Sequence, residues 1–180
     1  ELDGPEHAAR TVLDSALPRL GEGRPDLPMR IVRNAVVVDV DYCSRHETNT
    51  GIQRVVRHIM PRWRDRHDIV PVAAIDEHTA YRSLSPYEQA HVFDFGRHRD
   101  QLDRSAEAEF VPELVVPWQT TVVLPELPHP HSSPFLAGLA EFSGNRVGIV
   151  AYDMIPIITT ELRPFGEAGI FQRYLTIVKH

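Results

Sequence analysis

The segment T-G-I-Q-R-V at residues 50–55 places a glycine and an arginine at the start of an amphipathic helical pattern. Glycine there would let a backbone or a phosphate approach closely, and free helix-start amides favour an anion. Arg54 on the first turn would add charge, so we expect a pyrophosphate group to fit. The alternative is that Thr50 and Gly51 only cap the helix while Arg54 points at water. The segment lacks the G-x-G-x-x-G and G-K-[ST] phosphate-binding patterns, so both interpretations stay open.

A second candidate is the aspartate of A-Y-D-M-I-P, residues 151–156, which directly follows the pattern of a buried strand. A carboxylate at that point could bind sugar hydroxyls, with residues 153–156 lining a cleft. Asp153 could equally cap the following turn or pair with an arginine, which is the commoner fate of strand-end aspartates. The residues alone leave this choice open.

Apolar runs predict the strands that would hold these segments. The run at residues 35–40 is nearly unbroken, as in a strand buried on both faces of a parallel sheet. Further strands are predicted over residues 68–76, 120–125 and 146–153, with a shorter one in 78–84. Residues 43–50 are polar and predict a loop. Residues 85–116 show no clean period, which predicts a variable excursion with a short helix.

Apolar residues at steps of three and four predict an amphipathic helix from Gly51 to about His67. Thr50 and Gln53 fit a capping box at its start. Pro61 predicts a kink or an early break near Met60. Arginines fill the other positions and indicate a solvated face, with an acidic acceptor or a peripheral membrane contact as alternatives: Arg54, Arg57, Arg62, Arg64 and Arg66.

Alternating strands and helices predict an α/β, Rossmann-like domain with a mostly parallel sheet and helices on both faces. Three more helices are predicted, at residues 7–20, 135–142 and 168–180. We expect a terminal helix and linker at 1–28 and one domain at 29–180. Because ligands gather beyond the carboxyl ends of strands, the loops 41–51 and 153–164 should line the site.

Composition bounds the function classes. The 180 residues are 42% hydrophobic, as in a globular domain, and the formal net charge of −6 argues against a nucleic-acid partner. A single cysteine excludes an internal disulfide, and no apolar run approaches the roughly 20 residues of a membrane span. The opening lacks a signal-peptide pattern, which predicts a cytoplasmic protein. Both ends read as cut, so we expect the natural protein to be longer.

Other reactive side chains favour structural interpretations. His129 and His131 form an H-x-H pair in a proline-rich loop without an obvious third ligand, so no metal is predicted. Cys43 lies beside the first functional loop, but a nucleophile would need an activating base, and a packing role is favoured. Ser132 and Ser133 lack a G-x-S-x-G setting, so a hydrolase triad has no support.

Three motifs together resemble one family. G-I-Q-R-V-V-R-H-I at residues 51–59, Y-D-M-I-P-I at 152–157 and F-x-x-Y-L at 171–175 are similar to GT-B glycosyltransferases of the family-4 type. The resemblance spans roughly residues 35–180 and thins between 81 and 116.

The resemblance implies a two-domain, retaining enzyme of polysaccharide biosynthesis that uses a nucleotide-sugar co-substrate and needs no metal or other cofactor. This chain would be the N-terminal half, which holds a glycan or small-molecule acceptor. The absent C-terminal half would bind the donor, so the fragment alone would be inactive. Asp153 stands where many relatives place a histidine that contacts the donor sugar. The implied substrate-binding residues are Thr50, Gly51, Ile52, Arg54, Asp153, Met154 and Pro156.

Two alternatives come from other classes. A stand-alone Rossmann-like scaffold would bind a partner protein and perform no chemistry. An oxidoreductase or epimerase that uses a dinucleotide is weakened by the missing glycine fingerprint. We also expect the surface that would face a second domain to be exposed and to favour a homodimer.

Overall fold

The computed structural model describes residues 27–75, 78–96 and 107–152. Its centre is a seven-stranded sheet of order β1-β5-β4-β3-β2-β6-β7, in which only β4 runs against its neighbours. The strands are β1 (Met29–Val32), β2 (Val36–Asp39), β3 (Ile69–Ala74), β4 (Tyr81–Ser83), β5 (Leu114–Pro117), β6 (Thr121–Leu124) and β7 (Arg146–Ile149). The chain is therefore an α/β domain with a Rossmann-like, mostly parallel sheet.

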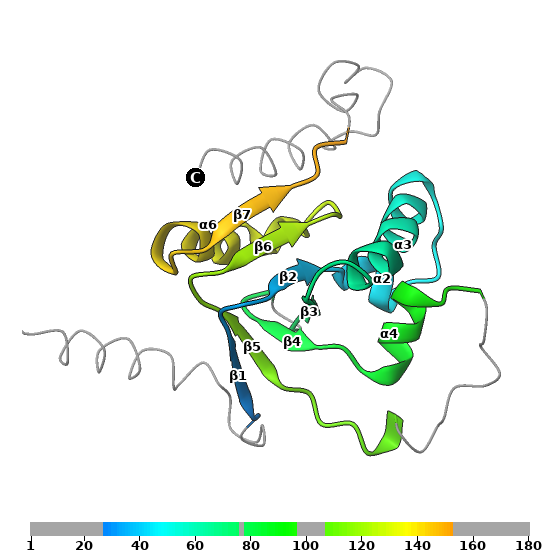
Figure 1. Ribbon diagram of the computed structural model, residues 1–180, viewed down its shortest axis with the longest axis horizontal. Coiled ribbons are helices and arrows are strands. Elements are labelled where there is room, and N and C mark those ends of the chain that lie inside the picture. The colour runs from blue at the N-terminus through cyan, green and yellow to red at the C-terminus, as the bar shows by residue number, and fades with distance from the viewer. Residues whose placement is uncertain (1–26, 76–77, 97–106, 153–180) are drawn as a thin grey trace, which may run out of the picture.

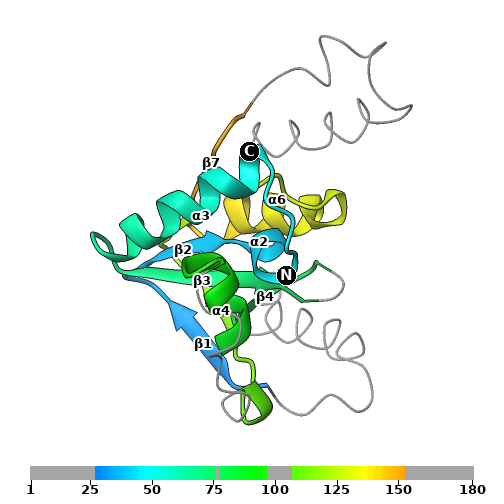
Figure 2. The same cartoon turned by 90° about the vertical axis from the view of Figure 1, so that its right-hand side faces the viewer.

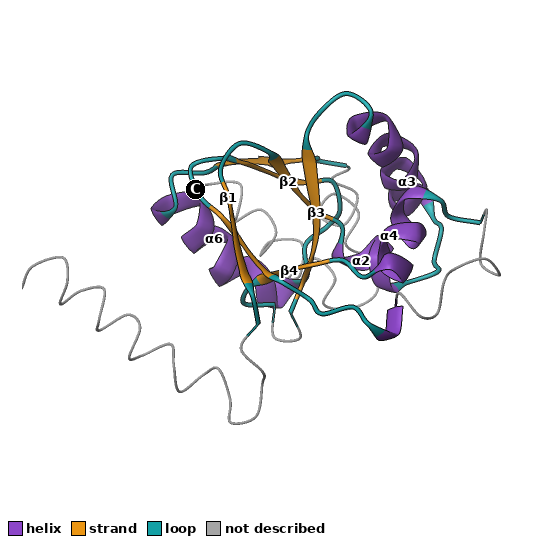
Figure 3. Cartoon of the chain, turned by 60° about the horizontal axis from the view of Figure 1, so that its bottom comes forward, coloured by secondary structure: helices purple, strands orange, loops and turns teal. Residues whose placement is uncertain are grey.

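The helices lie on both faces of this sheet. Figure 3 shows α6 on one side and α2, α3 and α4 together on the opposite side. The helices are α2 (Asp41–Arg45), α3 (Gly51–Arg64), α4 (Pro86–Phe93) and α6 (Ser133–Phe142), with a 3-10 turn η3 (Pro130–Ser132) before α6. No helix in the described ranges is both long and apolar enough to cross a membrane.

The sheet turns strongly across its width. Strands β2, β6 and β7 run side by side in Figure 1, whereas β1 lies across their direction, as Figure 2 also shows. The carboxyl ends of β2, β3 and β6 meet at one edge because these strands are parallel neighbours. This edge carries the first turns of α2 and the loop that leads to η3.

Two hydrophobic cores follow from the alternation of side chains along the central strands. Val37, Val122 and Leu136 belong to the core under α6, and Val38, Val56 and Met60 belong to the core under α2, α3 and α4. Val37 and Val38 are both fully buried although they point to opposite faces. The apolar run of β2 therefore reflects burial on both sides, as its sequence predicts.

Several local predictions are corrected. Residues 41–45, predicted partly as loop, form α2, and the excursion 85–116 includes the first three residues of β5 as well as the expected short helix α4. The helix α3 continues through Pro61 to Arg64, so the early break is wrong. The strand β1 precedes the central strand β2, and the sequence pattern did not predict it as a separate strand.

The predicted capping box of α3 is also wrong. Thr50 is the N-cap residue but its side chain accepts no backbone hydrogen bond; its hydroxyl instead donates to the Gln53 side chain. A complete capping box lies at α4, where the Ser85 hydroxyl accepts from the Glu88 amide at 3.3 Å and the Glu88 carboxylate accepts from the Ser85 amide at 2.9 Å. The Thr50–Gln53 pattern therefore predicted the start of α3 correctly but predicted the wrong hydrogen bonds there.

Candidate functional site

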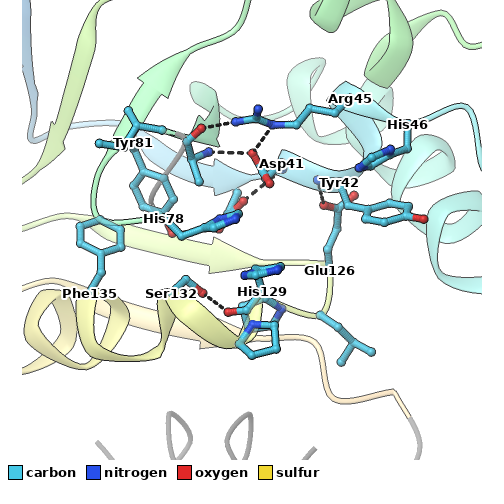
Figure 4. A pocket seen from close by; sticks show the side chains of 16 residues that line it. Asp41, Tyr42, Arg45, His46, His78, Tyr81, Glu126, His129, Ser132 and Phe135 are labelled. Carbon is cyan, nitrogen blue, oxygen red and sulfur yellow. Dashed lines mark hydrogen bonds and ion pairs between the residues drawn. The ribbon is translucent and has the colours of Figure 1, made fainter. Parts of the chain in front are cut away.

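A cavity of about 470 Å³ lies at the carboxyl ends of β2, β3 and β6, where ligands of parallel sheets are held (Figure 4). Its walls come from α2, the loop between β3 and β4, and the segment from β6 to α6. The polar and aromatic lining consists of Asp39, Asp41, Tyr42, Arg45, His46, His78, Tyr81, Glu126, His129, Ser132 and Phe135. Acidic groups thus share one concave space with aromatic rings.

Glu126 holds the start of α2 from a distant part of the chain. One of its carboxylate oxygens accepts from the Tyr42 amide at 2.8 Å and the other from the Cys43 amide at 2.9 Å. The N-cap residue Val40 has no polar side chain, so Glu126 satisfies amides that the helix itself leaves open. Burial raises the pKa of Glu126 to about 7, with repulsion from Asp39 adding to the effect and the hydrogen bonds from residue 43 opposing it.

Asp39 is the last residue of β2 and is hydrogen-bonded on both oxygens. The Asp41 amide donates to one oxygen at 3.1 Å, and the Tyr81 hydroxyl donates to the other at 3.0 Å. Burial raises the pKa of Asp39 to about 6, and the charge of Asp41 raises it further. Burial, and then the charge of Asp39, raises the pKa of the Tyr81 hydroxyl well above its ordinary value, so Tyr81 remains a donor.

Arg45, the arginine among the described lining residues, already has partners within the fold. The Asp41 carboxylate accepts from the Ala74 amide at 2.9 Å and from Arg45 Nε at 2.8 Å, and a terminal nitrogen of Arg45 donates to the Ala74 carbonyl. Arg45 thereby joins α2 to the end of β3 and neutralises Asp41. Asp39 and Glu126 have no ion-pair partner among the described residues.

Imidazole and benzyl rings close the opposite wall. The His78 and His129 rings stack at 4.1 Å with planes 9° apart, and His131 lies 5.1 Å from His129. Phe135 meets the ring of Tyr81 edge-on at 5.0 Å. Burial lowers the pKa of His129, and the neighbouring histidines lower it further, so this imidazole is uncharged at neutral pH. The cavity therefore carries an excess of negative charge.

The residues singled out from sequence at α3 lie elsewhere. Thr50, Gly51, Ile52 and Arg54 form the first turn of α3, and none of them lines the cavity. Arg54 borders a separate groove between α3 and the end of α4. A Cβ added to Gly51 would meet nothing within 4 Å, so the described part of the chain offers no steric reason for glycine.

The second predicted segment falls outside the described residues, which end at Tyr152 before Asp153, Met154 and Pro156. The Tyr152 hydroxyl donates to the Pro125 carbonyl, directly beside Glu126. The chain therefore passes next to the cavity wall at the point where its description ends.

Sequence reasoning missed two of the carboxylates that line the cavity, Asp39 and Glu126, whereas Asp41 begins the loop 41–51 that was expected at the site. Asp39 is the last residue of β2, and Glu126 follows β6 by two residues. Both strands were expected in one parallel sheet, so the signal was present: acids at the ends of two buried runs. To select these two acids one must know that β2 and β6 are neighbours in the sheet, and the hydrophobic pattern does not give the strand order.

Arg57 contradicts the prediction that the arginines of α3 form a solvated face. It is only 8% exposed, and its guanidinium donates to four backbone carbonyls: Cys43 at 3.2 Å, His46 at 2.6 Å, Thr48 at 2.6 Å and His91 at 3.2 Å. The loop between α2 and α3 is thus fixed by a buried cation, although an arginine in that pattern indicates solvent.

Cys43 and His129 both have contacts within the fold. Cys43 is fully buried, and burial together with the nearby Glu126 raises the pKa of its thiol, so it remains protonated. His129 accepts a hydrogen bond from the backbone amide of His131 at 3.3 Å. Within the described ranges, no set of three or more His, Cys, Asp and Glu side chains is arranged to hold a metal ion.

Comparison with known proteins adds no relative. No family model matches this chain, and neither a curated protein nor a solved structure matches it.

Proposed function

We propose that this chain is the acceptor-binding domain of a nucleotide-sugar-dependent glycosyltransferase and that the carboxyl-edge cavity holds the acceptor. The observation that carries the proposal is the combination of hydrogen-bonding carboxylates and aromatic rings in one cavity at the end of parallel strands. Carboxylate oxygens accept hydrogen bonds from sugar hydroxyls, and aromatic faces cover the apolar face of a sugar ring.

The charge of the cavity favours an acceptor over the phosphates of the donor. Asp39 and Glu126 face the space without an ion-pair partner in the described part of the chain, and Arg45 is held by Asp41. An additional phosphate would be repelled by these carboxylates at short range. A neutral, hydroxyl-rich ligand meets no such penalty. In this proposal the donor lies toward a second domain, with Thr50–Arg54 and Asp153–Pro156 on the donor side.

The same carboxylates suit proton transfer near neutral pH. Because the pKa values of Asp39 and Glu126 are raised to about 6 and about 7, either group can accept a proton from an acceptor hydroxyl. The hydrogen bonds from Tyr81 and the α2 amides keep both groups in fixed positions. Positioning and preorganised charge would supply the chain's own contribution to rate.

Tyr42 provides the binding test. Its side chain lines the cavity and is 39% exposed, and Tyr87 on α4 is equally exposed but lies outside the cavity. We expect neutral oligosaccharides to shift amide signals around the cavity in NMR titrations. Tyr42→Ala should weaken the best ligand about five- to tenfold through lost ring contact, while Tyr87→Ala leaves it unchanged. Equal effects of both substitutions would remove the cavity from the proposal.

Turnover tests the catalytic part. A sugar-nucleotide assay should compare the 180-residue chain with the product of the complete natural gene over a broad donor and acceptor panel. Activity in the natural product that is lost in Asp39→Asn, with the fold retained, would support the proposal. Absence of turnover and of glycan binding, together with capture of one defined protein partner, would favour the non-catalytic scaffold instead.

A further inference from the structure

A second depression lies at the opposite edge of the sheet. It has a volume of about 690 Å³ and is formed at the amino ends of β2, β3, β6 and β7. Its basic side chains come from three separate places: Arg33 between β1 and β2, Arg66 after α3, and Arg146 at the start of β7. Arginines that are distant in sequence therefore converge on one concave surface.

These three guanidinium groups are uncommitted. Arg33, Arg66 and Arg146 are exposed, and their side chains make no hydrogen bond or ion pair in the described structure. Arg45 at the other edge, by contrast, is bound by Asp41 at 2.8 Å. Like charges that share a depression without a partner repel one another, so a bound anion would relieve an existing cost.

Neutral donors surround the arginines. The side chains of Asn34, Gln119 and Thr121 also line the depression and make no hydrogen bond within the described ranges. Gln119 adopts a left-handed backbone with φ of 51°, and Gly144 beside it has φ of 68°. A non-glycine residue in this conformation is uncommon and recurs at binding sites and tight turns. The shape of this edge thus depends on two unusual backbone positions.

We propose that this depression binds a phosphate monoester. Among the described lining residues, three arginines face one acid, Asp68, and this balance of charge matches a phosphate monoester, which carries about −1.5 to −2 at neutral pH. Arginine's planar fork suits phosphate oxygens, and the neutral donors can take the remaining ones. The site is separate from the acidic cavity, because it lies at the other end of the same strands, and it does not depend on the proposed function.

The test is a titration with inorganic phosphate in phosphate-free buffer, followed by NMR of the full chain. We expect saturable shifts at Gly144 and Arg146. Arg66→Gln and Arg146→Gln should each raise the dissociation constant about tenfold, the loss of one charge-assisted hydrogen bond. Arg30→Gln is the matched control, because Arg30 is exposed and unpaired in the described part of the chain but lies outside the depression. Circular dichroism would confirm the fold of each variant.

Two outcomes overturn the proposal: phosphate that produces no saturable shift, or Arg30→Gln weakening binding as much as Arg66→Gln, which would indicate only overall charge. Vesicles that contain phosphatidic acid identify the source of the phosphate group. Arg66-dependent vesicle binding that inorganic phosphate displaces would assign a lipid headgroup, whereas phosphate binding without vesicle binding would assign a soluble ligand.

Discussion

The two ends of the central strands hold charge in opposite ways. At the carboxyl edge, Asp39 and Glu126 accept two hydrogen bonds each from groups of the fold. At the amino edge, Arg33, Arg66 and Arg146 are exposed and make no side-chain bond within the described residues. The carboxyl edge is thus an acidic cavity whose carboxylates are held in place, and the amino edge is a basic depression whose arginine side chains have no bonded partner among the described residues.

This difference separates two kinds of functional residue. Polar groups that the fold holds in place cost free energy to remove, so binding and stability change together at the carboxyl edge. Exposed arginines contribute little to folding, so their removal should affect a ligand alone. The comparison therefore predicts large effects on stability at one edge and almost none at the other.

The largest effect is expected at Arg57, which fixes the loop that follows α2 at the carboxyl edge. Arg57→Met keeps the apolar stem but leaves four carbonyls without their donor, including those of His46 and Thr48. We expect a loss of about 3–5 kcal/mol in the free energy of unfolding, measured by urea denaturation.

Arg54→Met on the same helix is the control, since Arg54 is exposed and its side chain has no bond in the described structure; it should change stability by less than about 0.5 kcal/mol. If the two substitutions cost the same, the contrast between committed and uncommitted arginines is wrong.

A smaller, pH-dependent effect is expected at Asp39. Its pKa is about 6 in the folded chain against about 3.9 in an unfolded one, so the folded state binds more protons between these values. The contribution of Asp39 to stability therefore falls as pH rises from about 4 to about 7, by about 2 kcal/mol. Asp39→Asn should remove this slope, and it should also ease the repulsion that raises the pKa of Glu126.

The measurement is urea unfolding of wild type and variant across that pH range, because the difference between them cancels the other titrating groups. Arg66→Gln at the amino edge should keep the wild-type slope. An unchanged slope in Asp39→Asn would mean that this carboxylate is not held in its uncharged form by burial.

The sequence predicted the layers of this fold well, because they depend on local apolar runs. The buried run of β2, the helix start at Gly51 and the sheet with helices on both faces all followed from periodicity. The strand β5 was missed, since four residues after an irregular stretch carry too little pattern. The antiparallel direction of β4 could not be predicted either, because the sequence of a short strand does not indicate which strands it pairs with.

The site was less predictable for the same reason. Glu126 caps α2 across 84 residues of sequence, and no spacing rule connects Glu126 with Tyr42. Arg57 was assigned to solvent because its burial depends on loop carbonyls and on the Phe95 ring 3.6 Å from its guanidinium, and helical periodicity indicates neither contact. The capping-box pattern at Thr50 failed where the one at Ser85 succeeded, which shows that such a pattern permits a hydrogen bond without requiring it.

The smallest effect concerns one strained residue at each edge. His78 and Gln119 are the non-glycine residues with left-handed backbones in the described ranges, with φ of 53° and 51°. Gln119→Gly should raise stability by about 0.5–1 kcal/mol, because relief of the strain exceeds the added entropy of the unfolded chain. His78→Gly gains the same relief but loses the ring stacked on His129 at 4.1 Å, so its net effect should be near zero.

Thermal unfolding of both variants measures this difference as a shift of about 1–3 °C in Tm. Phosphate titration of Gln119→Gly adds a second readout, since the proposed site loses one neutral donor and keeps its three arginines. A stabilised variant with weakened phosphate binding would show that the amino edge retains a strained residue for its ligand. A destabilised variant would show instead that Gln119 serves the fold, and the two edges would then differ less than their hydrogen bonds indicate.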